Sequence, residues 1–347
     1  MNRWVMNRWA KMLTGLAVLC AVAAVTPHTT PFLLMLGTRI LILAILAMSL
    51  DLLLGFTGIA SLGHAAFLGL GAYMTAILAV RCQFGLGWDF WLVVLFGMLL
   101  GAATAALFAI FALRASGVYF LMITLALSQC VWGLAYRWDA LTGGDNGLNL
   151  PGRPAFGPIH LGNDTTYFYV VFAFFTLSLL LLYVFVESPF GRSLVGIREH
   201  EVRMRILGYN VWLHKYIVFI VSGAFGGLAG VLWAHVSSEV SPQDVTLTTS
   251  VDALLMVVLG GPGTLLGGVL GAVIVLLLRE YLSTIVPWWP YVLGGVYIAT
   301  ISYLPDGLLG TLRRRWRSAP VGVAPPPRLA QPSGRAEELE INQGGIK

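Results

Sequence analysis

Three titratable residues lie in strongly apolar parts of this sequence, where ionisable groups are rare and often functional. They are Asp51, His64 and Asp252. A charged group at the middle of a membrane-spanning helix costs about 2.5–3.5 kcal/mol on insertion scales, so such a residue normally faces protein or water. These residues could therefore carry a proton, contact a polar substrate or form structural hydrogen bonds.

Simpler roles also fit these three residues. Asp252 opens a short apolar stretch, where we expect its carboxylate to cap the helix and favour the helix dipole, with substrate contact as the alternative. We expect His64 to be hydrogen-bonded between helices, although a proton-carrying role stays open. Asp51 lies four residues before Gly55, near the predicted cytoplasmic end of its segment. The three are not visibly paired, which weighs against a proton- or sodium-coupled secondary transporter.

Two glycine-rich breaks, at 55–58 and 260–263, interrupt apolar segments. Unwound backbone at membrane depth is tolerated where it is buried in protein or lines a water-filled path, so the breaks could mark a transport pathway or a hinge. Close packing explains them equally well. Packing is the preferred interpretation for the small-residue pairs Gly223/Gly227, Gly226/Gly230 and Gly267/Gly271. The pathway or helix-break candidates are Gly55, Thr57, Gly58, His64, Gly260, Gly261, Pro262 and Gly263.

The stretch 187–215 is a long loop with the character of an amphipathic helix, because charged and apolar residues alternate along it. Ser188 and Pro189 are typical of a helix start, and Gly208 is typical of a left-handed cap at a helix end. Such a helix could dock into a groove on a soluble partner or lie on lipid. The acidic residues Glu199 and Glu201 favour the protein partner.

The amino-acid composition predicts the kind of secondary structure that carries these residues. Of 347 residues, 58% are hydrophobic and 11% are charged, too little charge for a water-soluble domain of this length. Apolar blocks of about 20 residues, the length that crosses a bilayer, recur along the chain. We therefore predict an all-α polytopic membrane protein with about nine spanning helices and one half-helix. The spans are expected near 9–26, 32–54, 59–80, 90–113, 117–136, 167–186, 216–236, 264–278 and 288–304.

Lysine and arginine are retained on the cytoplasmic side, and they predict the orientation. The stretch 251–259 is too short to span, so we interpret it as a half-helix that descends and turns at the second glycine break. With that turn, 16 of the 21 basic residues lie inside. The predicted organisation is a cytoplasmic amino terminus at 1–11, a transmembrane domain at 12–312 and a basic, then disordered, cytoplasmic tail at 313–347. We expect the first span to be uncleaved rather than a signal peptide.

Five segments, in order, resemble the LivM-type subunit of the LivHM family, the permeases of branched-chain amino acid ABC importers. They are SLDLLLGFTGIASLGHAAFLGLGAY (49–73), ASGVYFLMITLALSQ (115–129), LTGGDNGL (141–148), SGAFGGLAGVLWA (222–234) and VVLGGPGTLLGGVLGA (257–272). The resemblance covers about residues 35–310. It implies that 187–215 is the loop that inserts into the ATPase subunit, with Ser188, Pro189, Gly191, Arg192, Arg198, Glu199, Glu201 and Gly208 as its coupling residues. The stretch 198–201 lacks the alanines of the wider ABC permease pattern.

The resemblance also implies the partners and the activity. It implies a homologous permease subunit in a heterodimer, two ABC ATPase subunits and a soluble binding protein, which meets the outer loop around Asp145 and Asn146. The expected cargo is a branched-chain or similar amino acid, with urea or a short amide as the alternative. The sequence has no P-loop, so ATP is expected to bind a partner subunit. We find no enzyme motif and no metal-ligand spacing, and we expect no bound cofactor. The lipid bilayer is the other expected partner, and nucleic acid is not an expected partner.

Overall fold

The computed structural model of this chain describes residues 30–84, 87, 89–156, 159–160, 162–285, 288–303 and 307–311. The amino terminus at 1–11, the span predicted at 9–26 and the tail predicted at 313–347 lie outside the described residues.

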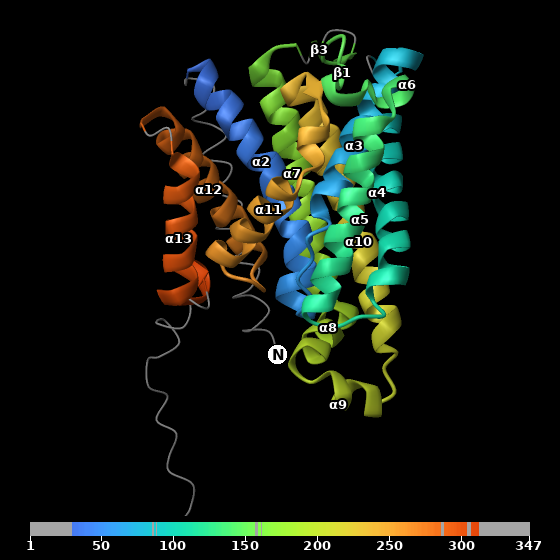
Figure 1. Cartoon of the computed structure of the whole chain (residues 1–347), viewed down its shortest axis with the longest axis vertical. Helices are drawn as coiled ribbons and strands as arrows, with labels where there is room; N and C mark the ends of the chain where they lie inside the picture. The colour runs from blue at the N-terminus through green and yellow to red at the C-terminus, as the bar shows by residue number, and fades with distance from the viewer. Residues whose placement is uncertain are drawn as a thin grey trace, which may run out of the picture. The chain divides into compact units, whose positions relative to one another are not determined.

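Long apolar helices make up most of the described chain (Figure 1). Among the described residues, seven are long and apolar enough to cross a membrane, the first of them being α2 with its π-helical continuation η2. Two shorter helices correspond to the predicted half-helix and the predicted last span. They are α11 (Leu247–Gly260) and α13 (Trp289–Tyr303). The long helices are α2 (Pro31–Asp51) with η2 (Leu52–Thr57), α3 (His64–Cys82), α4 (Phe90–Ala112), α5 (Val118–Arg137), α7 (Asp164–Glu187), α10 (Val211–Ser237) and α12 (Leu265–Ile285). This confirms the predicted all-α polytopic membrane fold.

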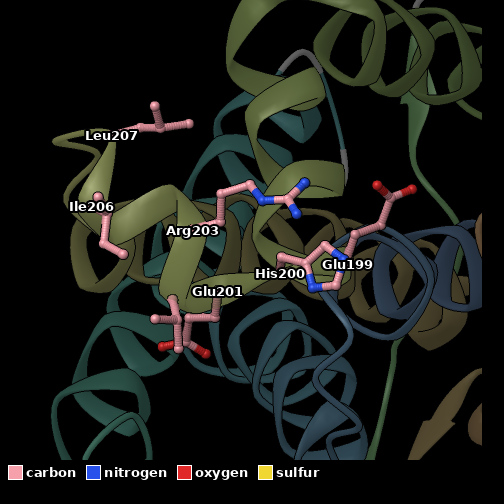
Figure 2. Close-up of a pocket in the computed structure, with 7 residues that line it drawn as sticks. Glu199, His200, Glu201, Arg203, Ile206 and Leu207 are labelled. Carbon is pink, nitrogen blue, oxygen red and sulfur yellow. The ribbon is translucent and has the colours of Figure 1, made fainter. Parts of the chain in front are cut away.

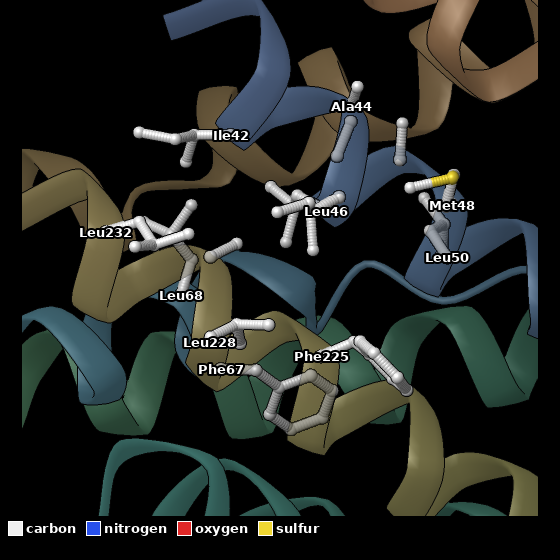
Figure 3. Packing of buried hydrophobic residues seen from close by; sticks show 14 of the residues in the cluster. Ile42, Ala44, Leu46, Met48, Leu50, Phe67, Leu68, Phe225, Leu228 and Leu232 are labelled. Atoms are coloured by element: carbon white, nitrogen blue, oxygen red, sulfur yellow. The ribbon is translucent and has the colours of Figure 1, made fainter. Parts of the chain in front are cut away.

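Helix α10 packs closely between α4 and α3 through its glycines. Cβ atoms added at Gly223 and Gly227 would lie 2.6 and 2.3 Å from the carbonyl oxygens of Gly101 and Gly97 on α4. A Cβ added at Gly230 would lie 1.9 Å from the carbonyl oxygen of Leu68 on α3. Contacts this short require glycine on α10, as expected of small residues at membrane helix interfaces. Figure 3 shows buried side chains of α2, α3 and α10 that belong to the same hydrophobic core.

The connecting segments gather at two ends of the helix bundle (Figure 1). At one end, β1 (Leu148–Asn149) pairs antiparallel with β4 (Glu239–Val240), so the predicted outer loops 137–166 and 237–250 meet. The short elements α6, η3 and β3 lie at this end, whereas α8 and α9 lie at the opposite end. Their bounds are α6 (Asp139–Thr142), η3 (Gly144–Asn146), β2 (Ala155–Phe156), β3 (Ile159–His160), η4 (Pro242–Val245), α8 (Pro189–Glu199) and α9 (Glu201–Ile206).

Three sequence-based expectations need correction. The helix expected from 59 begins at His64, because Gly58 adopts φ +76° and ends the preceding helix. The single helix expected from Ser188 to Gly208 divides at His200, whose non-helical backbone (φ −149°, ψ 83°) separates α8 from α9. Asp252 does not cap α11, because that helix begins five residues earlier at Leu247; its carboxylate instead lies 3.3 Å from Arg279 on α12.

The close contact between α10 and α4 predicts a large cost for one added methyl group. Gly227→Ala would place Cβ 2.3 Å from the backbone oxygen of Gly97, which cannot rotate away. We expect destabilisation by about 1–3 kcal/mol, the usual range for overpacking a tight interior. The thermal unfolding midpoint of the purified protein in detergent checks this. Gly133→Ala on α5, where a Cβ would meet nothing within 4 Å, is the matched control, and equal midpoints for the two variants would contradict the prediction.

Candidate coupling and pathway site

The start of α8 is built as the sequence predicts. Ser188 caps the helix, since its Oγ accepts a hydrogen bond from the backbone N–H of Gly191 at 3.1 Å, and Pro189 occupies the first turn. Gly191 is buried, and a Cβ there would lie 2.2 Å from the carbonyl oxygen of Val186 at the end of α7. Leu194 and Ile197 are buried further along α8. This face of α8 is therefore packed on the chain itself.

Helix α9 folds back on α8 and is tied to α10. Met204 packs against Gly196, where an added Cβ would lie 2.9 Å from Sδ. The Glu201 carboxylate accepts hydrogen bonds from Arg205 and Lys215, both at 2.8 Å. The hydrogen bond from Lys215 is the main reason that the pKa of Glu201 lies below its usual value. Gly208 follows α9 with φ +88°, the left-handed conformation predicted for it.

Exposed apolar side chains surround an open hollow on this segment (Figure 2). Val202, Ile206 and Leu207 are 71%, 80% and 65% exposed, whereas α8 buries its own apolar face. The hollow has a volume of about 580 Å³ and is lined by 199–203 together with Ile206 and Leu207. Arg192 does not line this hollow, and its guanidinium group lies 3.7 Å from the carboxylate of Glu187. The apolar surface on α9 has no cover among the described residues.

The two glycine breaks, which are far apart in sequence, meet each other. The first break is the π-helix η2, where the Thr57 hydroxyl donates to the carbonyl oxygen of Leu52 at 2.9 Å and Gly58 ends the helix. The second break contains Gly261 and Gly263, both at positive φ. The backbone N–H of Gly263 donates to Oδ1 of Asp51 at 2.8 Å, so a buried carboxylate at the end of α2 holds the turn between α11 and α12.

Arg198 of α8 reaches into this contact. Its Nη1 donates to the carbonyl oxygen of Gly55, and a Cβ added at Gly58 would lie 3.0 Å from its Cγ. A Cβ added at Gly263 would lie 3.0 Å from its Nη1. We call the set Asp51, Gly55, Gly58, Arg198 and Gly263 the glycine junction. Sequence reasoning named all five of these residues, Asp51 as a buried carboxylate and the others as break or coupling residues, but no local pattern shows that they meet.

Gly260 of the second break and Gly271 of α12 lie where the backbones of α11 and α12 pack closely. A Cβ at Gly260 would lie 1.8 Å from the carbonyl oxygen of Gly267, and one at Gly271 would lie 1.7 Å from that of Met256. Helices α11 and α12 are thus joined face to face through glycines. Pro262 lies between them and is partly buried. The structure therefore gives Gly260 and the Gly267/Gly271 pair the packing role.

His64 begins α3 inside the bundle rather than at its surface. Its Nε2 lies 2.8 Å from the hydroxyl of Ser222 on α10, and that hydroxyl donates to the carbonyl oxygen of Ser49 at 2.6 Å. This bears out the expected hydrogen bond between helices. Sequence reasoning did not single out the hydroxyls that serve the neighbouring backbone: Thr124 accepts from the N–H of Leu62, and Ser250 accepts from that of Ala65.

The predicted outer-loop residues lie at the β1–β4 end of the bundle, and ion pairs that the sequence did not reveal join the helices. Asp145 and Asn146 are exposed in η3. Nearer the helices, Arg39 of α2 lies 3.9 Å from Glu280 of α12. Arg279, the partner of Asp252, also lies over the ring of Trp289, 5.3 Å from its centroid. These pairs tie α12 to α2, α11 and α13.

Comparison with known proteins agrees with this architecture. A family described as the permease component of branched-chain amino acid transport systems matches residues 32–301. The chain is 30% identical to the high-affinity branched-chain amino acid transport permease LivM of Escherichia coli over 301 residues, which cover 80% of this chain and 70% of the relative. The LivM protein of Salmonella typhimurium matches equally, and a probable LivM of Methanocaldococcus jannaschii is 25% identical over 86% of this chain and 94% of its own. No solved structure matches the chain.

The helix bundle, with seven apolar helices of membrane-crossing length among the described residues, defines a polytopic membrane protein. The chain belongs to the family of permease components of branched-chain amino acid transport systems, and it crosses the membrane several times. Such a component works as a subunit of a larger transporter.

The tie between α9 and α10 predicts a pH-dependent mobility. Because the folded-state pKa of Glu201 is lowered, its stabilising effect is complete above its ordinary pKa of 4.5 and is lost as the pH falls through the folded-state value. We expect faster hydrogen exchange at 201–206 in Glu201→Gln at neutral pH, and in the wild type on acidification. Glu199→Gln, on the exposed neighbour, is the control; a Glu201→Gln exchange profile equal to that of the wild type would contradict the prediction.

Proposed function

We propose that this chain is a membrane-spanning subunit of an ATP-driven importer, and that α8 and α9 form the docking site for an ATPase subunit. The observation that carries the proposal is the exposed apolar surface of Val202, Ile206 and Leu207, which lies at one end of the bundle beside charged residues. Contiguous exposed apolar surface rimmed by polar groups is typical of a protein interface. Glu199 and Glu201 beside it favour a protein partner over an anionic lipid surface.

The charge distribution supports the orientation that docking requires. With the α8–α9 end in the cytoplasm, the topology predicted from the sequence puts 16 of the 21 lysines and arginines on that side. Both chain termini are then cytoplasmic and the β1–β4 end faces outward. We assign the membrane to the bacterial inner membrane.

The other partners follow from the transport-system family. A homologous permease subunit completes the membrane core as a heterodimer, two ATPase subunits bind below it, and a soluble binding protein delivers substrate at the outer end near Asp145 and Asn146. The chain binds no cofactor in this scheme, because ATP is used by the ATPase subunits.

Branched-chain amino acids are the proposed cargo, since the LivM relatives carry that name. More distant relatives include a ribose import permease of Haemophilus influenzae and a guanosine ABC transporter permease of Bacillus subtilis, so related permease sequences serve different substrates. Urea or a short amide is the alternative cargo. A proton-coupled mechanism has weaker support, because the Nε2 atom of His64 is engaged with Ser222.

The docking site predicts a specific loss of the ATPase subunit. Val202→Asp combined with Ile206→Asp introduces two charges into the apolar surface, and we expect co-purification of the ATPase from detergent to fall at least tenfold. Insertion into the membrane should be unchanged, because both side chains are exposed. The control is Leu247→Asp, an exposed leucine at the start of α11. Wild-type co-purification by the double variant would place the ATPase elsewhere.

Uptake measurements test cargo and energy source together. Cells that express the chain with its genomic neighbours should accumulate radiolabelled leucine, and ATP depletion should abolish this uptake. Urea uptake in place of leucine would keep the mechanism and change the cargo. Uptake that survives ATP depletion but collapses with the proton gradient, and that is lost in a normally expressed His64 variant, would contradict an ATP-driven importer.

A further inference from the structure

The glycine junction joins three segments that are distant in sequence. The end of α2 continues into η2, the turn between α11 and α12 is held by Asp51, and Arg198 comes from α8. The residues that bond across it are separated by 143 positions for Arg198 and Gly55, and by 212 for Gly263 and Asp51.

We propose that Arg198 is a positioning residue that transmits movement of the docked α8 helix to both helix breaks, in addition to any contact with the ATPase. This proposal rests on the proposed function, since it takes α8 as part of the docking segment. Its partner inside the chain is the backbone of η2, and through Asp51 the same movement reaches the α11–α12 turn. Arg198 therefore acts on the pathway helices through backbone groups rather than by touching the cargo.

The packing of α8 allows the helix to move as a rigid unit. Its start is capped by Ser188, and its inner face is buried at Leu194 and Ile197. A displacement of the helix must then carry its side chains along, because buried contacts move as packed units. Arg198 lies one residue from the carboxyl end of α8, next to the division at His200. The planar guanidinium group holds a carbonyl oxygen in a defined direction, and the flexible ammonium group of a lysine does so less well.

The two breaks are suited to receive that movement. The π-helical turn η2 and the positive-φ residues Gly58, Gly261 and Gly263 break the regular helix pattern at this point. Hinges are usually a few residues at the ends of elements that absorb changes in backbone angles. Gly55 leaves no space between the two halves of the contact, since a Cβ there would lie 2.0 Å from Oδ1 of Asp51 and 2.1 Å from the backbone nitrogen of Gly263.

The buried carboxylate gives the junction two possible states. Asp51 is fully buried, and only Oδ1 has a hydrogen-bond partner, whereas Oδ2 has none among the described residues. An unpaired buried carboxylate oxygen is costly, so a second arrangement that supplies a donor would be favourable. Arg198 is the nearby cation, and a shift of α8 that moves its guanidinium from Gly55 towards Oδ2 would supply that donor.

The test compares assembly, ATP hydrolysis and uptake in the complete importer reconstituted in vesicles. For Arg198→Ala we expect co-purification of the ATPase within twofold of the wild type, loss of the stimulation of ATP hydrolysis by loaded binding protein, and uptake reduced at least tenfold. Arg198→Lys should recover part of the uptake, because an ammonium group can still donate to the Gly55 carbonyl. Arg114→Ala, at an exposed arginine in the loop between α4 and α5, is the matched control, and we expect it to transport normally.

A second variant tests the junction without altering the docking surface. Gly55→Ala changes a buried position and should break the contact between Asp51 and Gly263. We expect the ATPase to co-purify with this variant and uptake to be lost, as for Arg198→Ala. Gly133→Ala is its matched control. Loss of the ATPase from Arg198→Ala would make Arg198 a docking residue, which overturns this inference and leaves the proposed function intact. Uptake within twofold of the wild type in either Arg198→Ala or Gly55→Ala would also overturn it.

Discussion

One buried hydrogen bond, from the backbone N–H of Gly263 to the carboxylate of Asp51, organises the α8 end of this permease. The carboxylate lies at the end of a long apolar helix with no exposed surface, where an ion without partners would be strongly unfavourable. The N–H group belongs to the turn between α11 and α12, outside the regular helix hydrogen bonds, and the carboxylate supplies its partner. Each group thus accounts for the position of the other.

Close approach of the backbones is the condition for that bond. Gly55 lies between the two partners, and any side chain there would occupy the space of the hydrogen bond itself. The turn is brought to this point by α11 and α12, which pack through Gly260 and Gly271 with no room for a Cβ. In the bundle interior, α10 uses glycine in the same way against α3 and α4. Because apolar lipid offers little hydrophobic drive to helix association, such contacts stabilise the bundle by packing.

Charged side chains serve two purposes in the described part of the chain. Arg198 contacts the chain's own backbone, which joins the surface segment α8 to the interior breaks. Elsewhere opposite charges pair between helices, as Asp252 of α11 does with Arg279 of α12 and Glu201 of α9 does with Lys215 of α10. These pairs tie neighbouring helices together.

The sequence by itself determined the membrane class, every long helix within the described residues and the start of α8, because these depend on local properties: apolar length, the Ser188–Pro189 cap and glycine breaks. It also located both helix breaks, at 55–58 and 260–263. The division at His200 and the pairing of Asp252 were decided by tertiary contacts, since Met204 packs back on Gly196 and Arg279 comes from another helix. Only the tertiary structure could join Asp51 and Arg198 to the breaks, because these contacts connect positions more than a hundred residues apart that no local periodicity relates.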